Sequence, residues 1–286
     1  MGRRRVTTQG GPVGFMQSRS RSHAHSRLSG RPAGPCRINA IQAVSASVGL
    51  YEKLELRIDL DADFCNPFDP EEIDLQATFT APSGKKWKIW GFYNPSSWAA
   101  LWMVRFTPTE TGTWHYVVTV NTPTDRAKSA RAECVVTASA HPGFVGIAPN
   151  RRYLMHSDHT PFYGVGLWYN DNCELYNQGA ITEADLDNLK KRGANFISFF
   201  PTTLETMGSG LGRYDENRCG RMDQLFDWCE RRDMKISWNL LFHSHVSRAV
   251  WVNPRYRHNP YRLISSAGDF FGSAEVWEYQ QKLFRY

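Results

Sequence analysis

The sequence predicts two successive architectures: an antiparallel β-sandwich, and after it a parallel sheet whose strands alternate with helices. Three observations lead to this prediction. Between residues 48 and 136, apolar and polar residues alternate in short runs that turn residues separate. No helical period interrupts that stretch. From about residue 160 the pattern changes to strand, helix and strand, which is typical of a parallel sheet.

Residues 1 to about 40 are rich in Gly, Arg and Ser and have no hydrophobic period, so we expect a disordered basic tail. The segment up to Arg37 holds eight Arg and no Asp, Glu or Lys. Without these eight, 26 of the 34 Lys and Arg remain against all 28 Asp and Glu, so the rest of the chain is mildly acidic. Basic tails can bind nucleic acid. No RNP, zinc-finger or helix-turn-helix pattern supports that role, and we expect no nucleic-acid partner.

The composition of this tail fits two explanations, a transit-peptide-like segment or a start codon placed upstream of the true one. The tail has no apolar h-region, so a secretory signal is not indicated. The chain has no run of 18 apolar residues, and we expect no transmembrane helix and no membrane partner. The sequence leaves the cellular compartment open.

The six Cys show neither a CxxC motif nor the spacing of zinc ligands. Cys229 falls on the apolar face of a predicted helix, which indicates a buried free thiol. Cys65 and Cys134 could pair within the sandwich. Two His clusters, His243-Ser-His245 and His156-Ser-Asp158-His159, resemble metal ligands, but such spacing is common by chance. No dinucleotide loop, P-loop or Ser nucleophile elbow occurs, so we expect no metal and no cofactor.

Six runs of alternating residues predict the strands of the sandwich. In the first, Leu54 to Leu60, apolar residues alternate with charged ones, as in a half-buried strand. Turn signals follow at 81–84 and 108–112. The other runs have their apolar positions at Leu75, Ala77 and Phe79; Trp87 and Ile89; Trp102, Val104 and Phe106; Trp114, Tyr116, Val118 and Val120; and Ala132, Cys134 and Val136. Short strands without helices indicate a sandwich of about 90 residues.

Three strand–helix units follow a link at His141-Pro142-Gly143. The expected strands are Phe162 to Tyr169, which we expect to be buried, Asn195 to Phe200, and Lys235 to Phe242. They alternate with predicted helices, so a parallel sheet follows.

The helices between these strands have recognisable ends. Thr182 is a good N-cap for the first helix, Asp185 completes a variant of the capping box, and Gly193 is the natural residue after the C-cap. The second helix covers about Met222 to Arg232 and carries Met222, Leu225, Phe226 and Cys229 on one face. A last helix begins near Ala274.

The parallel region is short. Residues 161–286 number 126, whereas a closed barrel of eight strand–helix units needs roughly 250 residues. A complete doubly wound domain could be that small. The chain stops inside an aromatic, amphipathic helix without a C-cap, so we expect the chain to be truncated before a further strand.

Several motifs of the sandwich resemble a known family. They are Asn66-Pro67-Phe68, Ala81-Pro82-Ser83-Gly84-Lys85, Gly91-Phe92-Tyr93, Val104-Arg105-Phe106-Thr107-Pro108 and Gly112-Thr113-Trp114-His115-Tyr116. Together they resemble the DUF5060 sandwich, which typically precedes a glycoside-hydrolase-like barrel. Gly143-Phe144-Val145 and Pro161-Phe162-Tyr163-Gly164-Val165-Gly166 resemble the start of such a barrel, of the DUF4038 or cellulase-like kind. The resemblance covers about residues 48–286.

The resemblance implies a multidomain fold class, an antiparallel, immunoglobulin-like β-sandwich followed by the first half of a (β/α)8 barrel. The expected parts are the tail 1–40, the sandwich 48–140 and the partial barrel 150–286. In such barrels two carboxylates face each other across the glycosidic bond, the first at the end of strand four. This chain ends before strand four, so no catalytic residue is assigned and we expect the chain by itself to be inactive. Phe199-Phe200-Pro201-Thr202 also lacks the Arg that many relatives carry at the end of strand two.

The remaining candidate residues lie at the carboxyl ends of the predicted parallel strands, where function gathers in barrels. Trp168 and Asp171 end the first strand; Asn239, His243 and His245 share one parity along and beyond the third. We expect Trp168 to stack on a sugar and the others to donate or accept hydrogen bonds. The alternative is core packing for Trp168 and ordinary loop polarity for the rest.

The main functional hypothesis is thus the N-terminal fragment of a glycoside hydrolase that acts on O-glycosidic bonds of a poly- or oligosaccharide. The alternative is a non-catalytic carbohydrate-binding or adhesion protein. In that alternative, exposed sandwich aromatics such as Trp90, Trp98 and Trp102 would bind the sugar.

Overall fold

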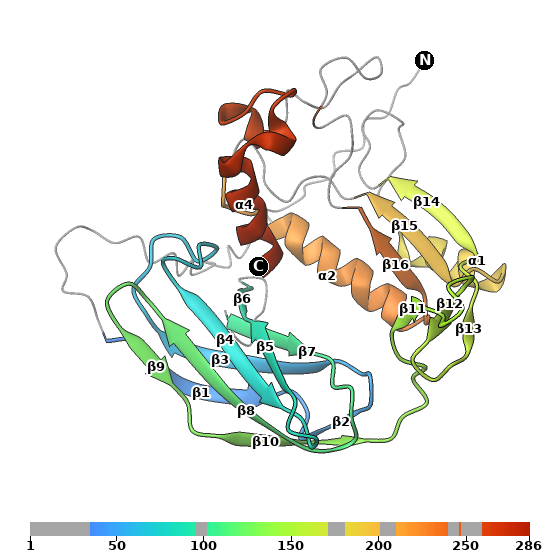
Figure 1. Ribbon diagram of the computed structural model, residues 1–286, viewed down its shortest axis with the longest axis horizontal. Helices are drawn as coiled ribbons and strands as arrows, with labels where there is room; N and C mark the ends of the chain where they lie inside the picture. Colours follow the sequence, from blue (N-terminus) through green and yellow to red (C-terminus); the bar gives the residue numbers. More distant parts are fainter. Residues whose placement is uncertain (1–34, 95–101, 171–180, 201–209, 240–245, 247–258) are drawn as a thin grey trace, which may run out of the picture. The chain divides into compact units, whose positions relative to one another are not determined.

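The computed structural model describes residues 35–94, 102–170, 181–200, 210–239, 246 and 259–286. Residues 33–286 form one compact unit. The described part is mostly β-sheet with few helices, and its strands form four separate sheets (Figure 1).

The first two sheets make up the sandwich. One sheet has the strand order β1-β3-β7-β6, and the other has the order β2-β10-β8-β4-β5 with β9 paired to β8. The strands of the first are β1 (Arg37–Ala43), β3 (Leu54–Asp61), β6 (Phe92–Tyr93) and β7 (Trp102–Phe106). Those of the second are β2 (Ser47–Gly49), β4 (Asp74–Thr80), β5 (Lys86–Trp90), β8 (Gly112–Asn121), β9 (Arg126–Lys128) and β10 (Ala132–Thr137).

The two sheets share one core, because β3, β4, β8 and β10 bury alternate residues against the opposite sheet. Phe79 of β4 stacks on Phe106 of β7 with ring centroids 4.2 Å apart, and Trp114 of β8 packs edge-on against Phe106. Trp114 is fully buried, and its indole N–H donates to the Glu110 carbonyl at 2.8 Å, so its one polar atom is satisfied. All six strands expected from the alternating pattern are present.

The sandwich departs from the expectation at its edges. β1 begins at Arg37, inside the segment to about residue 40 for which we expected disorder, and it pairs with β3. The second sheet is mixed rather than antiparallel, because β2 pairs with β10 in parallel. Cys65 and Cys134 are free thiols, the first exposed and the second buried, so the disulfide considered between them does not form.

A small antiparallel sheet follows the sandwich, and the sequence did not predict it. It contains β11 (Val145–Ile147), β12 (Leu154–His156) and β13 (Pro161–Phe162). The expectation of one buried strand from Phe162 to Tyr169 is therefore wrong. Phe162 belongs to β13, and the next strand, β14 (Gly166–Asn170), begins four residues later. Within the described residues β14 pairs with β15 alone, and its Leu167 and Trp168 are more than half exposed.

The last sheet is parallel, with the order β14-β15-β16 (Figure 1). β15 spans Phe196–Phe200 and β16 spans Lys235–Trp238. A Cβ at Gly166 would lie 1.6 Å from the Phe196 carbonyl oxygen, so only glycine lets β14 approach β15 this closely. The third strand is described only to Trp238, and residues 240–242 of its expected range lie outside the described residues.

Helices α1 (Glu183–Lys191) and α2 (Glu216–Glu230) connect these strands and cover one face of the sheet. The capping box of Thr182 and Asp185 at α1 is confirmed, and Gly193 has the positive φ of 87° that the chain needs there. α2 begins six residues before the expected Met222, because Asp215 caps a polar first turn that has no apolar period. Cys229 is buried and free, as expected.

The C-terminal part contains two short 3-10 helices and one α-helix, η2 (Pro260–Leu263), η3 (Phe270–Gly272) and α4 (Ala274–Arg285). Side chains of α4 contact the sandwich: Lys282 Nζ lies 3.2 Å from an Asp69 carboxylate oxygen, and the Tyr286 hydroxyl donates to the Tyr93 carbonyl at 3.1 Å. None of the described helices is long and apolar enough to cross a membrane.

Candidate functional site

The parallel sheet has one face packed against helices and one face turned away from them. Ile197, Phe199 and Ile236 point to the helices, where they join Leu186 of α1 and Leu225 of α2 in one core. The alternate residues of the same strands point the other way. We call the second side the open face, and its described members are Trp168, Ser198, Ser237 and Asn239.

The register of the strands aligns these side chains. Trp168 pairs with Ser198 and Ser198 pairs with Ser237, so the three stand in one row across β14, β15 and β16. Asn239 follows β16 by one residue and has the same parity as Ser237. Because neighbouring parallel strands lie roughly 4.8 Å apart, an indole, two hydroxyls and an amide fall within the reach of one or two sugar rings.

Trp168 is 53% exposed. More than half of the indole surface is accessible to solvent, and both sugar stacking and core packing stay predictions for this residue. Its apolar ring surface is accessible beside polar side chains, which is the arrangement that a flat, amphipathic ligand requires.

The amide nitrogen and the amide oxygen of Asn239 differ in their hydrogen bonds. Its side-chain amide donates to Ser198 Oγ at 3.2 Å and to the Phe199 carbonyl at 3.3 Å, and its backbone N–H donates to the same carbonyl at 2.9 Å. These bonds fix the amide against the end of β15. No donor among the described residues reaches Oδ1, so this oxygen remains able to accept a hydrogen bond from a ligand hydroxyl.

The other three predicted site residues, Asp171, His243 and His245, lie outside the described residues. The structure adds Ser198 and Ser237, which the sequence reasoning missed. A signal for them existed: each is the one small hydroxyl residue in an otherwise apolar or aromatic end of a strand, and both have the parity of Trp168 and Asn239.

The described side chains of the open face carry no carboxyl group. Indole, hydroxyl and amide groups can stack and hydrogen-bond, but they cannot supply the paired carboxyl groups that glycoside hydrolysis needs. No group of three or more His, Cys, Asp or Glu that could hold a metal occurs among the described residues.

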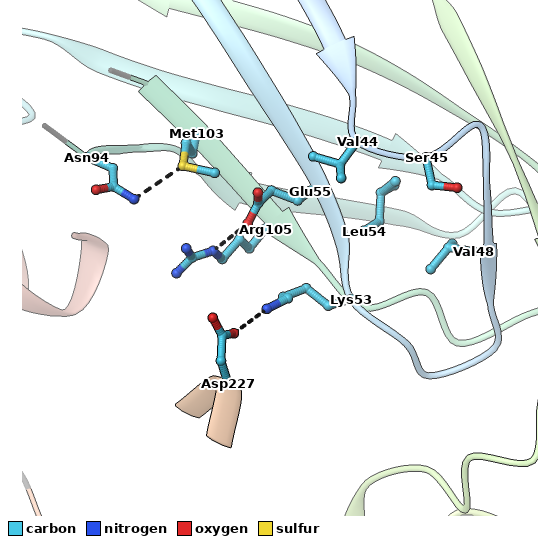
Figure 2. A pocket seen from close by; sticks show the side chains of 10 residues that line it. All are labelled: Val44, Ser45, Val48, Lys53, Leu54, Glu55, Asn94, Met103, Arg105 and Asp227. Atoms are coloured by element: carbon cyan, nitrogen blue, oxygen red, sulfur yellow. Dashed lines mark hydrogen bonds and ion pairs between the residues drawn. The ribbon is translucent and has the colours of Figure 1, made fainter. Parts of the chain in front are cut away.

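A separate cavity of about 350 Å³ lies between the outer side of β3 and β7 and helix α2 (Figure 2). Its charged members are paired with other protein groups. Arg105 donates to Glu55 at 3.0 Å and makes a bidentate pair with Asp223 of α2 at 2.6 and 3.0 Å. Lys53 lies 2.9 Å from Asp227 and 3.2 Å from Glu230. The residues that line the cavity are Val44, Ser45, Val48, Lys53, Leu54, Glu55, Asn94, Met103, Arg105 and Asp227.

These ion pairs raise the pKa of both cations. Burial alone would lower the pKa of Arg105, but the hydrogen bonds and charges of Asp223 and Glu55 outweigh that effect. The same balance, with Asp227 and Glu230 as the partners, raises the pKa of Lys53. These ion pairs connect the sandwich to α2. Because their charges compensate one another, the cavity offers a ligand no uncompensated charge.

Residues 47–121 match the model of a domain of unknown function, DUF5060. This match confirms the resemblance within the sandwich. It does not extend to the parallel region, so the resemblance to DUF4038 and to a (β/α)8 barrel stays a prediction. No curated protein matches the sequence.

Among solved structures, the chain is similar to a protein of Bacteroides vulgatus ATCC 8482 that is provisionally assigned as a glycoside hydrolase. The TM-score is 0.51 at 18% identity, over 68% of this chain and 41% of that one. At this identity the likeness shows the fold alone, and the chain spans 41% of that protein's length. β-Glucuronidases of Parabacteroides merdae and Bacteroides uniformis match at 11% identity over 70% and 72% of this chain and 24% and 22% of theirs. Their TM-scores of 0.22 and 0.23 carry no argument.

Proposed function

We propose that this chain is the N-terminal part of a carbohydrate-active protein of the glycoside-hydrolase type. In this proposal residues 48–140 form an accessory sandwich, and residues 150–286 hold the first three strand–helix units of a (β/α)8 barrel. The parallel order β14-β15-β16 and the position of α1 and α2 on one face support it, because a barrel has its helices outside and its ligand at the carboxyl ends of the strands.

The observation that carries the proposal is the exposed indole of Trp168 in a row with Ser198 and Ser237, beside the fixed amide of Asn239. A sugar offers an apolar C–H surface to an aromatic ring and hydroxyls to the groups around it. The proposed ligand is therefore a poly- or oligosaccharide. The hydrolytic carboxylates of the parent protein would come from segments other than the described open face.

The alternative, a non-catalytic carbohydrate-binding protein that uses the aromatics of the sandwich, rests on Trp90, which is 39% exposed. Trp102 does not support it, since it is 4% exposed and packs against Tyr93 and Phe64 in the core. Trp98 lies outside the described residues.

The test is the binding of the full chain to an array of neutral plant and microbial oligosaccharides. Trp168→Ala should weaken binding at least about tenfold, because it removes the stacking surface. Trp277→Ala is the matched control, since Trp277 of α4 is 56% exposed and lies outside the open face. Equal affinities of wild type and Trp168→Ala would refute the proposal, and so would the absence of binding to any glycan.

A further inference from the structure

The outer face of the second sheet of the sandwich carries a group of cations that the proposed function does not use. In edge strand β5, Trp87 and Ile89 pack against the core, whereas Lys86, Lys88 and Trp90 are exposed on the other side. The strand therefore presents two lysines and a tryptophan at every second position to solvent.

The register extends this pattern into a platform. Lys86 pairs with Thr80, Lys88 with Thr78, and Trp90 with Gln76, so short polar side chains of β4 stand beside each of them. On the far side of β4, Gln76 pairs with Thr119 of β8, and Thr119 pairs with Lys128 of β9. We call this surface, defined by Lys86, Lys88, Trp90, Gln76, Thr78, Thr80, Thr119 and Lys128, the lysine platform.

The lysines of the platform are not neutralised. Within the described part of the chain, Lys86, Lys88 and Lys128 have no carboxylate within ion-pairing distance, in contrast to Lys53, Lys235 and Lys282. Near its border, Asp74 accepts a hydrogen bond from Gln76, and Glu133 lies 3.1 Å from His115. A surface with several uncompensated cations attracts anionic ligands.

Trp90 gives the platform a second recognition element. Its ring is exposed and has two cations near it, Lys88 Nζ at 5.8 Å and the Arg285 guanidinium carbon at 5.9 Å from the ring centroid. The carboxylate of an acidic sugar that contacts the exposed part of the indole would lie beside these cations.

We propose that the lysine platform binds a polysaccharide that carries carboxylate groups, such as a chain of uronic acids. This inference rests on the proposed carbohydrate function but uses a different surface from the open face. A purely structural role competes with it: lysines on an edge strand also prevent pairing with other chains, and that role requires no ligand.

The test measures the affinity of the full chain for polygalacturonate and for its fully methyl-esterified form, which has the same backbone without the charges. The wild type should prefer the acidic form, with an affinity that falls as salt rises. Lys86→Gln/Lys88→Gln should weaken binding to polygalacturonate about tenfold. Trp90→Ala should weaken it about fivefold.

The matched control is Lys190→Gln/Lys191→Gln, which removes the same charge from the last turn of α1. The Arg-rich residues 1–37 contribute equally in all variants, so their background cancels. Unchanged affinity of the Lys86→Gln/Lys88→Gln variant, or equal loss in the control, overturns the inference. If the inference is overturned in this way but Trp168→Ala abolishes binding to neutral glycans, the proposed function of the open face stands and the inference about the platform fails. If only the platform variants lose binding, the inference stands and the proposed open-face function fails.

Discussion

At the scale of the residue, Asn239 and Trp168 illustrate two ways in which a strand end becomes a binding surface. Asn239 is held by hydrogen bonds to β15, so its free acceptor has a fixed direction. Trp168 lies on β14, the edge strand of the described parallel sheet, and is more than half exposed. A substitution of Asn239 should therefore affect both ligand binding and local stability, whereas a substitution of Trp168 should affect binding alone.

This coupling gives a prediction for Asn239. Asn239→Ala should lower the free energy of unfolding by about 1 kcal/mol, since the Ser198 hydroxyl and the Phe199 carbonyl lose a donor. Asn239→Asp has nearly the same shape but places a carboxylate beside those acceptors, so it should destabilise the chain more than Ala does. Thermal unfolding of the three proteins measures this order. A melting temperature of Asn239→Asp equal to that of the wild type would contradict the assigned hydrogen bonds.

The cysteines give a second prediction at this scale. Burial raises the pKa of the Cys229 thiol to about 11. At pH 8 only about one molecule in a thousand then carries a thiolate there, and this fraction rises about tenfold per pH unit until the pKa is reached. Iodoacetamide at pH 8, followed by peptide mass spectrometry, should label the exposed Cys65 well before Cys229. Equal labelling rates in the folded chain would show that α2 is not packed as described.

At the scale of the element, the ion pairs of Arg105 connect the sandwich to α2. Arg105→Gln should destabilise the chain by about 1–3 kcal/mol, because hydrogen bonds between charged groups are lost at a partly buried site. Combined with Asp223→Asn in a double-mutant cycle, it should give a coupling energy of about 1 kcal/mol. Arg231→Gln is the control, since Arg231 is 60% exposed and its pair with Glu183 contributes about 0–1 kcal/mol. Additive effects of Arg105→Gln and Asp223→Asn would mean that this contact does not form.

The sequence predicted best those strands in which buried and more exposed residues alternate. β3, β4 and β8 bury every second side chain, and the period of two is plain. β1 was missed because it is an edge strand whose residues are mostly exposed or half-buried, so its pattern resembles the tail before it. The break between β13 and β14 was missed for a related reason: an apolar run shows no period that marks where one strand ends and another begins.

At the scale of the whole molecule, the site could be predicted only in part. The sequence placed Trp168 and Asn239 at the carboxyl ends of two predicted strands, which a parallel sheet brings to one edge. It did not predict that both lie on one face, which follows from the strand register. Ser198 and Ser237 fall in line with them because of the register between neighbouring strands. That register depends on pairing between segments that are separated by helices and loops, and the local sequence pattern does not show it. The lysine platform likewise needs the register of the hairpin β4-β5 and of the more distant strand β8.

Hydrogen–deuterium exchange of the full chain, with and without the neutral oligosaccharide that binds most tightly on the array, tests whether the open face binds carbohydrate. Binding at the open face should slow exchange in the peptides that contain Trp168, Ser198 and Asn239, and it should leave β4 and β5 unchanged. Protection confined to strands of the sandwich would contradict the assignment of the open face as the carbohydrate site and would favour the non-catalytic alternative.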